Sequence, residues 1–355
     1  MSTTPDLSEL NLKIGQLFMT GIPDTQLGEE TLSLIRDYHP GGIILFSRNI
    51  KDPIQLTGLC RDLQDEAMHH QGIPLFLAVD QEGGRVSRLR EPFTVFPGNA
   101  AIGINDHPVE RAREFGLVTA TEMKMIGLNM DLAPVVDVQK TKVEKHLAGR
   151  TFGEDPEKVS LLGRNVIRAL QETGVMAVAK HFPGLGHTSL DPHYHLPKID
   201  LSLEEIERVN LPPFKAAIEE GVSGIMTSHA IYPALDSWRS ATLSSSILTN
   251  LLRKKMKFDG LIITDDLEMG AVAGHWGVAK GAVAAFEAGA DILLICMDQK
   301  NLRESINMIR NMLLQGKISF QRLHQSYERI VKVKAEFLDS KEKIPLAQVK
   351  EYFKI

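Results

Sequence analysis

Cysteine is scarce in this sequence, with only two residues, Cys60 and Cys296, in a chain of 355. Two cysteines without metal-ligand spacing cannot form a disulfide framework, so we expect two buried thiols in a reduced, cytoplasmic protein. No apolar run reaches the roughly 20 residues that a membrane span needs. The N-terminal segment also lacks the basic stretch and apolar core of a signal peptide. The sequence therefore predicts a protein without a membrane anchor.

An excess of positive charge is also missing. The chain has 40 Lys and Arg against 45 Asp and Glu, a net charge of -5. Without a basic stripe interleaved with aromatic residues, the sequence gives no indication of a nucleic-acid partner. The Gly83–Gly84 pair is too short for a dinucleotide fingerprint, and no Walker-type loop is present. We expect a soluble monomer that acts on a small molecule and uses neither a cofactor nor a metal.

Short apolar runs are what the sequence does contain, at intervals of roughly 30 to 50 residues. Several are continuously apolar, as is typical of strands buried on both faces. Amphipathic segments with helical spacing separate them, such as Pro156 to Glu172 and a segment that begins at Ser202 with a capping box to Glu205. The eight runs are Leu17 to Gly21, Gly42 to Phe46, Leu75 to Val79, Met130 to Ala133, Val175 to Ala179, Gly224 to Thr227, Leu261 to Thr264 and Ile292 to Cys296.

Eight alternations of strand and helix favour a single (β/α)8 barrel of the TIM type over a doubly wound sheet. We expect this one domain to cover residues 1–355, with a helical tail from about 299 and no second domain. Active sites of this fold lie at the carboxyl ends of the strands. Four of the expected strands end in polar residues, namely Asp80, Lys180-His181, Ser228-His229 and Asp265-Asp266.

Asp265 directly follows the run Leu261 to Thr264, so its carboxylate should emerge at the barrel mouth. A carboxylate there can act as a nucleophile, a general base or a metal ligand. The alternative is a structural N-cap for a helix beginning at Leu267. Asp266 suits that capping role better, which leaves Asp265 facing the cavity.

The loop from Lys180 to Pro197 is rich in histidine and shaped by glycine and proline. Asp191 and His193 are two residues apart, and a carboxylate beside an imidazole fixes its tautomer and makes it a serviceable general acid. A solvated loop histidine is the plainer alternative. A zinc site built from His187, His193 and His195 is another, although the first strand offers no further ligand.

Charged residues also follow the third run, in the segment DQEGGRVSRLR. Asp80 and Arg88 could clamp the hydroxyl groups of a polar ligand, or form only a surface ion pair. Arg150, in AGRTFGEDP, is a further charged residue close to a barrel end.

Taken together, these segments closely resemble glycoside hydrolase family 3, and within it the bacterial β-N-acetylglucosaminidases of the NagZ type. The resemblance covers nearly the whole chain in the same order, through the motifs GGIILFSRN, LAVDQEGGRVSRL, MDLAPVVDV, AGRTFGEDP, KHFPGLGHTSLDPHYHLP, IMTSHAIYPALD and IITDDLEMGAV.

The resemblance implies a role for each matching position. Asp265 would be the nucleophile, His193 the acid/base and Asp191 its assisting carboxylate, in a retaining two-step hydrolysis. His229 is a further possible site residue. The resemblance also implies a role in recycling peptidoglycan fragments in the cytoplasm. The implied sugar-binding residues are Asp80, Arg88, Arg150, Lys180 and His181.

The catalytic loop departs from the family pattern GHGDxxxDSH at three positions, where this chain has Leu185, His187 and Pro192. The spacing of the dyad is kept, so we expect its chemistry to be preserved. Pro192 stiffens the backbone between Asp191 and His193 and removes one N–H donor. Alternative activities are a glycosyl phosphorylase, a β-glucosidase of the same family, a metal-dependent hydrolase barrel and a non-catalytic sugar-binding barrel.

Overall fold

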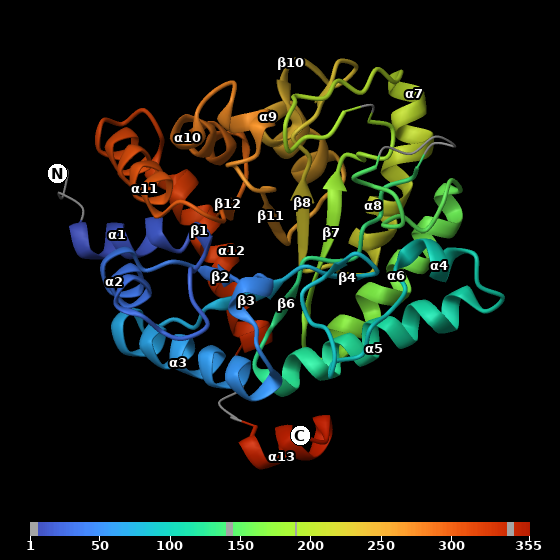
Figure 1. The fold of residues 1–355 in the computed structure, drawn as a ribbon. Coiled ribbons are helices and arrows are strands. Elements are labelled where there is room, and N and C mark those ends of the chain that lie inside the picture. The colour runs from blue at the N-terminus through green and yellow to red at the C-terminus, as the bar shows by residue number, and fades with distance from the viewer. Residues whose placement is uncertain (1–5, 140–144, 189, 339–343) are drawn as a thin grey trace.

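The computed structural model describes residues 6–139, 145–188, 190–338 and 344–355. Eight parallel strands form one sheet, in the order β11-β8-β7-β6-β3-β2-β1-β12, at the centre of the molecule (Figure 1). All eight expected strands are confirmed. They are β1 (Phe18–Gly21), β2 (Gly42–Ile44), β3 (Phe76–Val79), β6 (Met130–Asp131), β7 (Met176–Phe182), β8 (Gly224–Thr227), β11 (Leu261–Ile263) and β12 (Leu293–Ile295).

The sheet curls into a nearly closed (β/α)8 barrel, as the alternation of strands and helices predicts. Strand β1 pairs with β12 in parallel, with Thr20 opposite Ile295. The remaining seam, between β11 and β12, has a parallel bridge from Ile263 to Ile292, and the amide of Leu267 donates to the carbonyl of Leu294 at 2.9 Å. Side chains add to this seam, because the amide of Leu294 donates to Thr264 Oγ1 at 2.9 Å.

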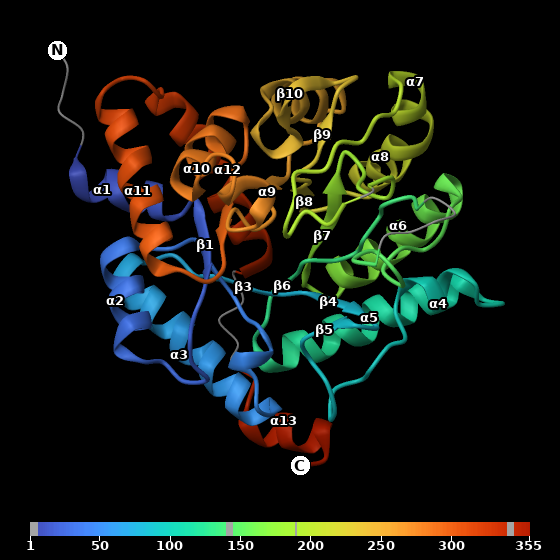
Figure 2. The same ribbon diagram turned by 45° about the horizontal axis from the view of Figure 1, so that its top comes forward.

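Helices form a ring around the strands (Figure 2). Every residue of the eight barrel strands is buried, which explains why most of their residues are apolar. The helices are α1 (Leu7–Gly15), α2 (Glu29–Tyr38), α3 (Pro53–Gln71), α4 (Asn99–Gly103), α5 (Pro108–Ile126), α6 (Pro156–Glu172), α7 (Leu203–Glu205), α8 (Leu211–Glu219), α9 (Gly270–Ala273), α10 (Val278–Ala288), α11 (Gln299–Leu314), α12 (Phe320–Leu338) and α13 (Leu346–Phe353).

Helix α6 shows how the local sequence determines an element of this ring. Asp155 caps it by accepting a hydrogen bond from the amide of Glu157, and Pro156 occupies the first turn. Its apolar stripe, which includes Val159, Leu162 and Val166, is buried. The predicted capping box of Ser202 and Glu205 is also present, at the start of α7.

Two short antiparallel ribbons extend from the barrel strands. One joins β4 (Gln81–Gly83) to β5 (Val86–Ser87) directly after β3, and the other joins β9 (Ile231–Tyr232) to β10 (Asp236–Ser240) after β8. Segments Ser47–Asn49 and Ala241–Leu243 are 3₁₀-helical, whereas Ile206–Asn210 and Ser246–Lys255 are π-helical. Both ribbons lengthen loops that follow barrel strands, where the fold places ligand-binding groups.

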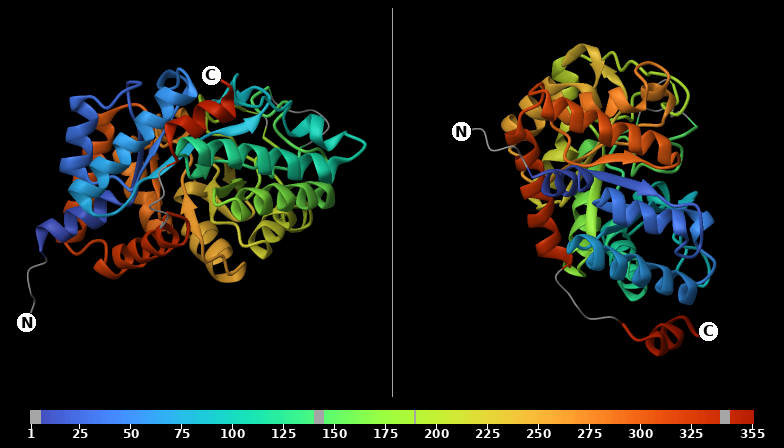
Figure 3. Two further views of the ribbon diagram at one scale, coloured as in Figure 1. Left: turned by 90° about the horizontal axis from the view of Figure 1, so that it is seen from below. Right: turned by 90° about the vertical axis from the view of Figure 1, so that its left-hand side faces the viewer.

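The expected helical tail is present as α11, α12 and α13. Helix α12 reaches the opposite end of the barrel, where the buried ammonium of Lys334 donates to Gln16 Oε1 at 2.7 Å and to the carbonyl of Pro74 at 2.6 Å. Helix α13 packs on α3 and lies apart from the rest of the tail (Figure 3). None of the helices among the described residues has the length and apolar content that crossing a membrane requires.

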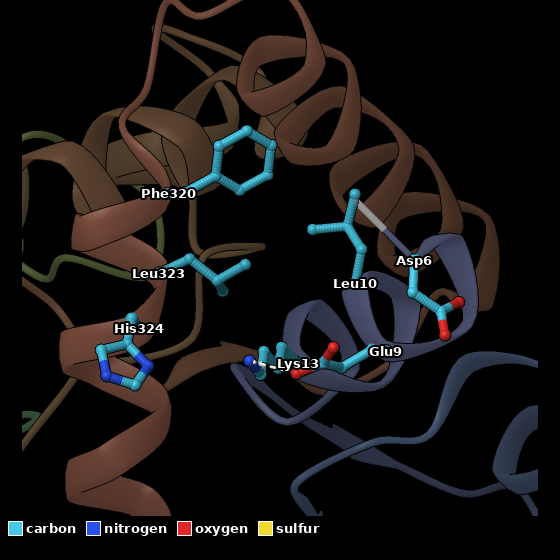
Figure 4. A pocket seen from close by; sticks show the side chains of 7 residues that line it. All are labelled: Asp6, Glu9, Leu10, Lys13, Phe320, Leu323 and His324. Carbon is cyan, nitrogen blue, oxygen red and sulfur yellow. Dashed lines mark ion pairs between the residues drawn. The ribbon is translucent and has the colours of Figure 1, made fainter. Parts of the chain in front are cut away.

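A cavity of about 270 Å³ lies between α1 and α12 on the outside of the barrel (Figure 4). Leu10, Phe320 and Leu323 form its apolar wall, and the ion pair of Lys13 with Glu9 lies at its edge. None of the residues that the sequence singles out for chemistry lines this cavity, so the site has to be sought at the strand ends.

Candidate active site

A buried cluster of charges links the ends of β3 and β7. Lys180 belongs to β7 and is only 2% exposed. Its Nζ lies 2.8 Å from Asp80 Oδ1 and 2.7 Å from Glu82 Oε1, so one ammonium connects two carboxylates. The strand-end positions of Asp80 and Lys180, a hundred residues apart in sequence, thus converge.

Two arginines complete this cluster. Arg150 binds Glu82 in a bidentate manner, with Nε 2.7 Å from Oε2 and Nη2 2.8 Å from Oε1. Arg88 donates through Nη2 to Asp80 Oδ2 at 3.1 Å. The pair of Asp80 and Arg88 is not a surface ion pair, because both side chains are largely covered.

In this cluster, charge pairing has a larger effect on the pKa values than burial has. Burial alone would raise the pKa of both carboxyls, but Lys180 and the arginines hold the pKa of Asp80 well below its usual range and that of Glu82 at about 2. Burial likewise acts to lower the pKa of Lys180, and the two carboxylates outweigh it, so that this pKa is raised. All three groups are therefore charged at neutral pH, which keeps the cluster tightly held.

Asp131, at the end of β6, lies beside the same cluster, but here the effect of burial on the pKa outweighs that of the neighbouring charges. Burial raises the pKa of Asp131 well above its usual value, against one hydrogen bond at 3.0 Å that its Oδ1 accepts from the amide of Gln81. Its Oδ2 has no hydrogen-bond partner among the described residues. Burial without a partner charge therefore favours the neutral form of Asp131, in contrast to Asp80 and Glu82.

His181 follows Lys180 and is also buried. Its Nδ1 lies 2.8 Å from Asp137 Oδ2, while Asp137 Oδ1 accepts hydrogen bonds from the amides of His181 and Leu185. This carboxylate fixes the orientation of the imidazole ring and leaves Nε2 outside the pair. Asp137 also anchors the start of the histidine-rich loop.

The dyad of Asp191 and His193 lies in that loop and is much more exposed. His193 Nδ1 lies 2.7 Å from Asp191 Oδ1, which also accepts the amide of His193 at 3.0 Å. Burial raises the pKa of Asp191, but the hydrogen bonds from His193 outweigh it and lower that pKa. The ionised Asp191 favours the tautomer with a proton on Nδ1, so Nε2 is the nitrogen able to exchange a proton with a ligand.

Asp265 follows β11 and is partly buried, with its Oδ1 accepting the amide of Asp266 at 2.8 Å. The expectation that Asp266 caps a helix beginning at Leu267 is wrong, since α9 begins at Gly270. Asp266 instead accepts the amides of Glu268 at 3.1 Å and Cys296 at 3.3 Å, so it closes a turn and ties that turn to β12. Burial raises the pKa of Asp266 to about 7.

His229, after β8, supports the same turn. Its Nε2 donates to the carbonyl of Asp266 at 2.9 Å, and its Nδ1 lies 2.7 Å from Thr242 Oγ1. Burial lowers the pKa of His229, so the ring is neutral at pH 7. This geometry makes His229 a support for the Asp265 turn.

The loop of His193 rests on the segment that follows Asp265. The amide of Gly270 donates to the carbonyl of His193 at 2.9 Å, and the amide of Ala271 donates to the carbonyl of Pro192 at 3.2 Å. A Cβ at Gly270 would lie 2.8 Å from the His193 carbonyl oxygen, so glycine permits this close approach. The segments that carry Asp265 and His193 are therefore in direct contact.

The histidine loop does not assemble the zinc site considered above within the described part of the chain. There, no group of three or more His, Cys, Asp or Glu side chains is close enough to hold a metal ion. His187 and His195 both lie in this part, whereas Ser189 of the same loop lies outside it.

Two central carboxylates, Glu82 and Asp137, escape the sequence reasoning. Glu82 lies in DQEGG, two residues after Asp80, and the two-residue period of extended chain is the signal that could have identified it. Asp137 follows β6 in APVVDV, and a search for polar residues several positions beyond each strand end would have found it.

Comparisons with known proteins identify the family of this chain. The model of the glycosyl hydrolase family 3 N terminal domain matches residues 9–333. A beta-hexosaminidase of Thiobacillus denitrificans is 37% identical over 283 residues, which are 78% of this chain and 77% of that protein. Beta-hexosaminidase A of Pseudoalteromonas piscicida is 34% identical over 346 residues, 91% of this chain and 58% of the relative.

Among solved structures, a glycoside hydrolase family 3 beta-N-acetylglucosaminidase from a Paenibacillus species superposes with a TM-score of 0.92 at 36% identity. The match covers 94% of this chain and 64% of that one. This chain therefore spans less than two thirds of the length of both the Pseudoalteromonas and the Paenibacillus proteins.

Proposed function

The chain belongs to glycoside hydrolase family 3, and from this premise we propose that it is a retaining exo-β-N-acetylglucosaminidase. It removes a terminal β-linked N-acetylglucosamine from the non-reducing end of its substrate. The observation that carries this proposal is the contact between α9, which follows the Asp265 turn, and the loop of the Asp191–His193 dyad, because retaining hydrolysis needs a nucleophile and a proton donor at one sugar.

The buried charged cluster binds the terminal sugar in this proposal. Asp80, Lys180 and Arg88 present acceptors and donors that are already held in place by one another, so few side chains need to become ordered when a hydroxyl group binds. His181 and Arg150 extend the same surface. Such a preorganised polar site suits a ring with a hydroxyl group on almost every carbon.

In the first chemical step, a carboxylate oxygen of Asp265 attacks the anomeric carbon and forms a glycosyl ester. The bond from that carbon to the leaving oxygen breaks, and its electron pair stays on the oxygen. His193 donates the Nε2 proton to this oxygen, while Asp191 stabilises the imidazolium from which the proton comes. The products are the free alcohol and the covalent intermediate.

In the second step, water replaces the ester. Neutral His193 takes a proton from the water molecule, whose oxygen attacks the anomeric carbon and displaces the carboxylate of Asp265. The sugar leaves with its original β configuration, and His193 has regained its proton. His229 keeps the turn of Asp265 in place throughout, through its hydrogen bond to the Asp266 carbonyl.

The physiological substrate that we propose is a muropeptide, so that the reaction serves peptidoglycan recycling in the cytoplasm. This part of the proposal rests on the resemblance of the motifs to bacterial family members. A glycosyl phosphorylase would use the same intermediate and let phosphate attack in place of water. An imidazole acid/base repels phosphate less than a carboxylate does, which is why phosphate is included in the test below.

The first test measures nitrophenol release from the β-N-acetylglucosaminide and the β-glucoside, each with and without phosphate and with and without EDTA. We expect preference for the N-acetyl sugar, no effect of EDTA, and free N-acetylglucosamine as the product even when phosphate is present. A sugar phosphate product would establish the phosphorylase, and preference for the glucoside would establish a β-glucosidase. Loss of activity in EDTA would restore the zinc hypothesis for the histidine loop.

The assignment of the nucleophile has a separate test. A fluorinated N-acetylglucosaminide that forms the intermediate but breaks it down slowly should add one sugar mass to a peptide containing Asp265. The D265N variant should show no labelling and almost no turnover. Full turnover by D265N would contradict the role of Asp265.

A further inference from the structure

The position of the acid/base restricts where the leaving group can lie. His193 must reach the leaving oxygen to protonate it, so the group attached to that oxygen lies beside His193 during the reaction. The inference below rests on the proposed function, since it concerns the other half of the same substrate. The buried charged cluster holds the terminal sugar and leaves the side chains next to His193 to meet the leaving group.

Tyr194 is the immediate neighbour of His193, and its ring is unusually exposed. The residue is 75% exposed, and its ring centroid lies 6.4 Å from that of His193 at a tilt of 51°. Its main chain is nevertheless held, because its amide donates to the carbonyl of Asp191 at 3.2 Å. Its Cα also lies close to Gly270, 3.1 Å from where a Cβ would be. A fixed backbone therefore presents a bare aromatic ring beside the proton donor.

Trp238 provides a second bare ring on the neighbouring loop. It is 85% exposed on β10, where its amide donates to Asp236 Oδ1 at 3.0 Å. The ribbon of β9 and β10 is bound to the end of the histidine loop by the bridge from Ile231 to Lys198, and the two lie side by side (Figure 2). Trp238 and Tyr194 are the two most exposed Trp, Tyr or Phe side chains among the described residues.

We propose that Tyr194 and Trp238 form a platform that binds the leaving group, and that this group begins with a sugar ring. One face of a pyranose carries mainly C–H groups, which are apolar and weakly positive, and such a face packs favourably on the negative face of an aromatic ring. Both rings lie on loops that follow barrel strands, where this fold builds its binding sites. The two halves of the substrate are thus recognised differently, the terminal sugar by charges and the leaving sugar by aromatic rings.

The test compares two substrates with equally poor leaving groups, so that both need the proton from His193. One is the β-1,4-linked disaccharide of N-acetylglucosamine. The other is the methyl β-glycoside of a single N-acetylglucosamine, whose leaving group has no ring. The Y194A and W238A variants should each lower kcat/KM for the disaccharide about tenfold, the scale of one aromatic contact. Neither should change kcat/KM for the methyl glycoside.

Two further variants serve as controls. Y194F keeps the ring and should behave like the wild type with both substrates. Tyr352 is 41% exposed on α13, outside the loops that carry His193 and Trp238, and Y352A should also change nothing. These controls separate loss of the platform from a general effect of removing an aromatic side chain.

Other outcomes overturn the inference. Equal losses for both substrates would show that Tyr194 acts only by positioning His193, and an unchanged rate with the disaccharide would show that the ring is not used. A wild-type protein that turns over neither substrate would contradict the proposed function instead. In that case, the affinity for the disaccharide, measured by calorimetry, would test the platform independently of turnover. Equal affinities of the wild type and Y194A would disprove the platform.

Discussion

The two halves of the candidate site are built in opposite ways. Lys180, Asp80 and Glu82 are covered by the barrel and paired with one another, whereas His193 and Asp191 lie on a loop with the side chain of His193 57% exposed. In the proposed function, the first group benefits from a rigid position because it binds the hydroxyl groups of the terminal sugar. The proposed acid/base has to reach both the leaving oxygen and the attacking water, and an exposed position permits this.

The difference also separates stability from catalysis. Removing one partner of a buried charge cluster leaves the remaining charges with less compensation, so the cluster is coupled to the folding of the barrel. Removing an exposed loop histidine costs little stability, because water solvates whatever is left. Substitutions in the two regions should therefore give different combinations of lost stability and lost rate.

The largest effect is expected for K180M, which keeps the length of the side chain and removes its charge. Asp80 and Glu82 then face each other without the ammonium, and the free energy of unfolding should fall by about 3–5 kcal/mol together with loss of turnover. Denaturant unfolding checks the first effect and the aryl glycoside assay the second. The matched control is K255M, which removes an exposed partner of Glu207 and should cost less than about 1 kcal/mol. Equal losses for both variants would refute the contrast.

A smaller effect, dependent on pH, is expected for D266N. Because burial raises the pKa of Asp266 to about 7, the folded protein binds a proton that the unfolded chain releases near pH 4. In the wild type this residue's contribution to stability is therefore full below pH 4 and is lost as the pH rises towards 7. Asparagine can still accept the amides of Glu268 and Cys296, but it does not ionise.

The stability of D266N relative to the wild type should therefore increase between pH 4 and pH 7, by on the order of 2–4 kcal/mol. Thermal or denaturant unfolding of both proteins at several pH values measures this difference directly. A constant difference across the range would mean that Asp266 ionises in the folded protein as it does in the unfolded chain.

The smallest effect is expected for G270A, which tests the contact between the two regions. A Cβ at this position would press on the carbonyl of His193, so the loop should shift away from Asp265. We expect kcat/KM to fall about tenfold for substrates that need a proton from His193, with little change for dinitrophenyl glycosides, whose leaving group needs none. On α3, G58A adds the same methyl group where nothing lies within 4 Å, and should leave both rates unchanged. Equal losses with both substrates would point to damage at Asp265 instead.

The sequence predicts the barrel well because its signals are local. Each strand is a short run that is buried on both faces, and α6 carries its own cap and apolar stripe. The pairing of Asp191 with His193 is also local, since two residues separate them. Periodicity and short spacing are sufficient for features of this kind.

The features that sequence reasoning misses depend on contacts between distant segments. Glu82 becomes important only because Lys180 and Arg150 converge on it, and nothing near Glu82 in the sequence indicates either partner. The sequence predicts that Asp266 caps a helix, but the amide of Cys296, the residue after β12, gives it a different role. Strand-end position identifies candidate residues, whereas their pairing requires the three-dimensional structure.

The seam between β11 and β12 has a consequence for the order in which the protein folds. Strand β12 is the last to be synthesised, yet it pairs with β1, the first, which makes the closing contacts of the barrel extremely non-local. The turn of Asp265 receives hydrogen bonds from β12 and the residue after it, through Leu294 and Cys296. During translation, the first seven barrel strands therefore emerge before Asp265 can have its final surroundings. If Asp265 is the nucleophile, as we propose, the site becomes complete only when the barrel closes, and we expect a ribosome-bound chain without β12 to be inactive.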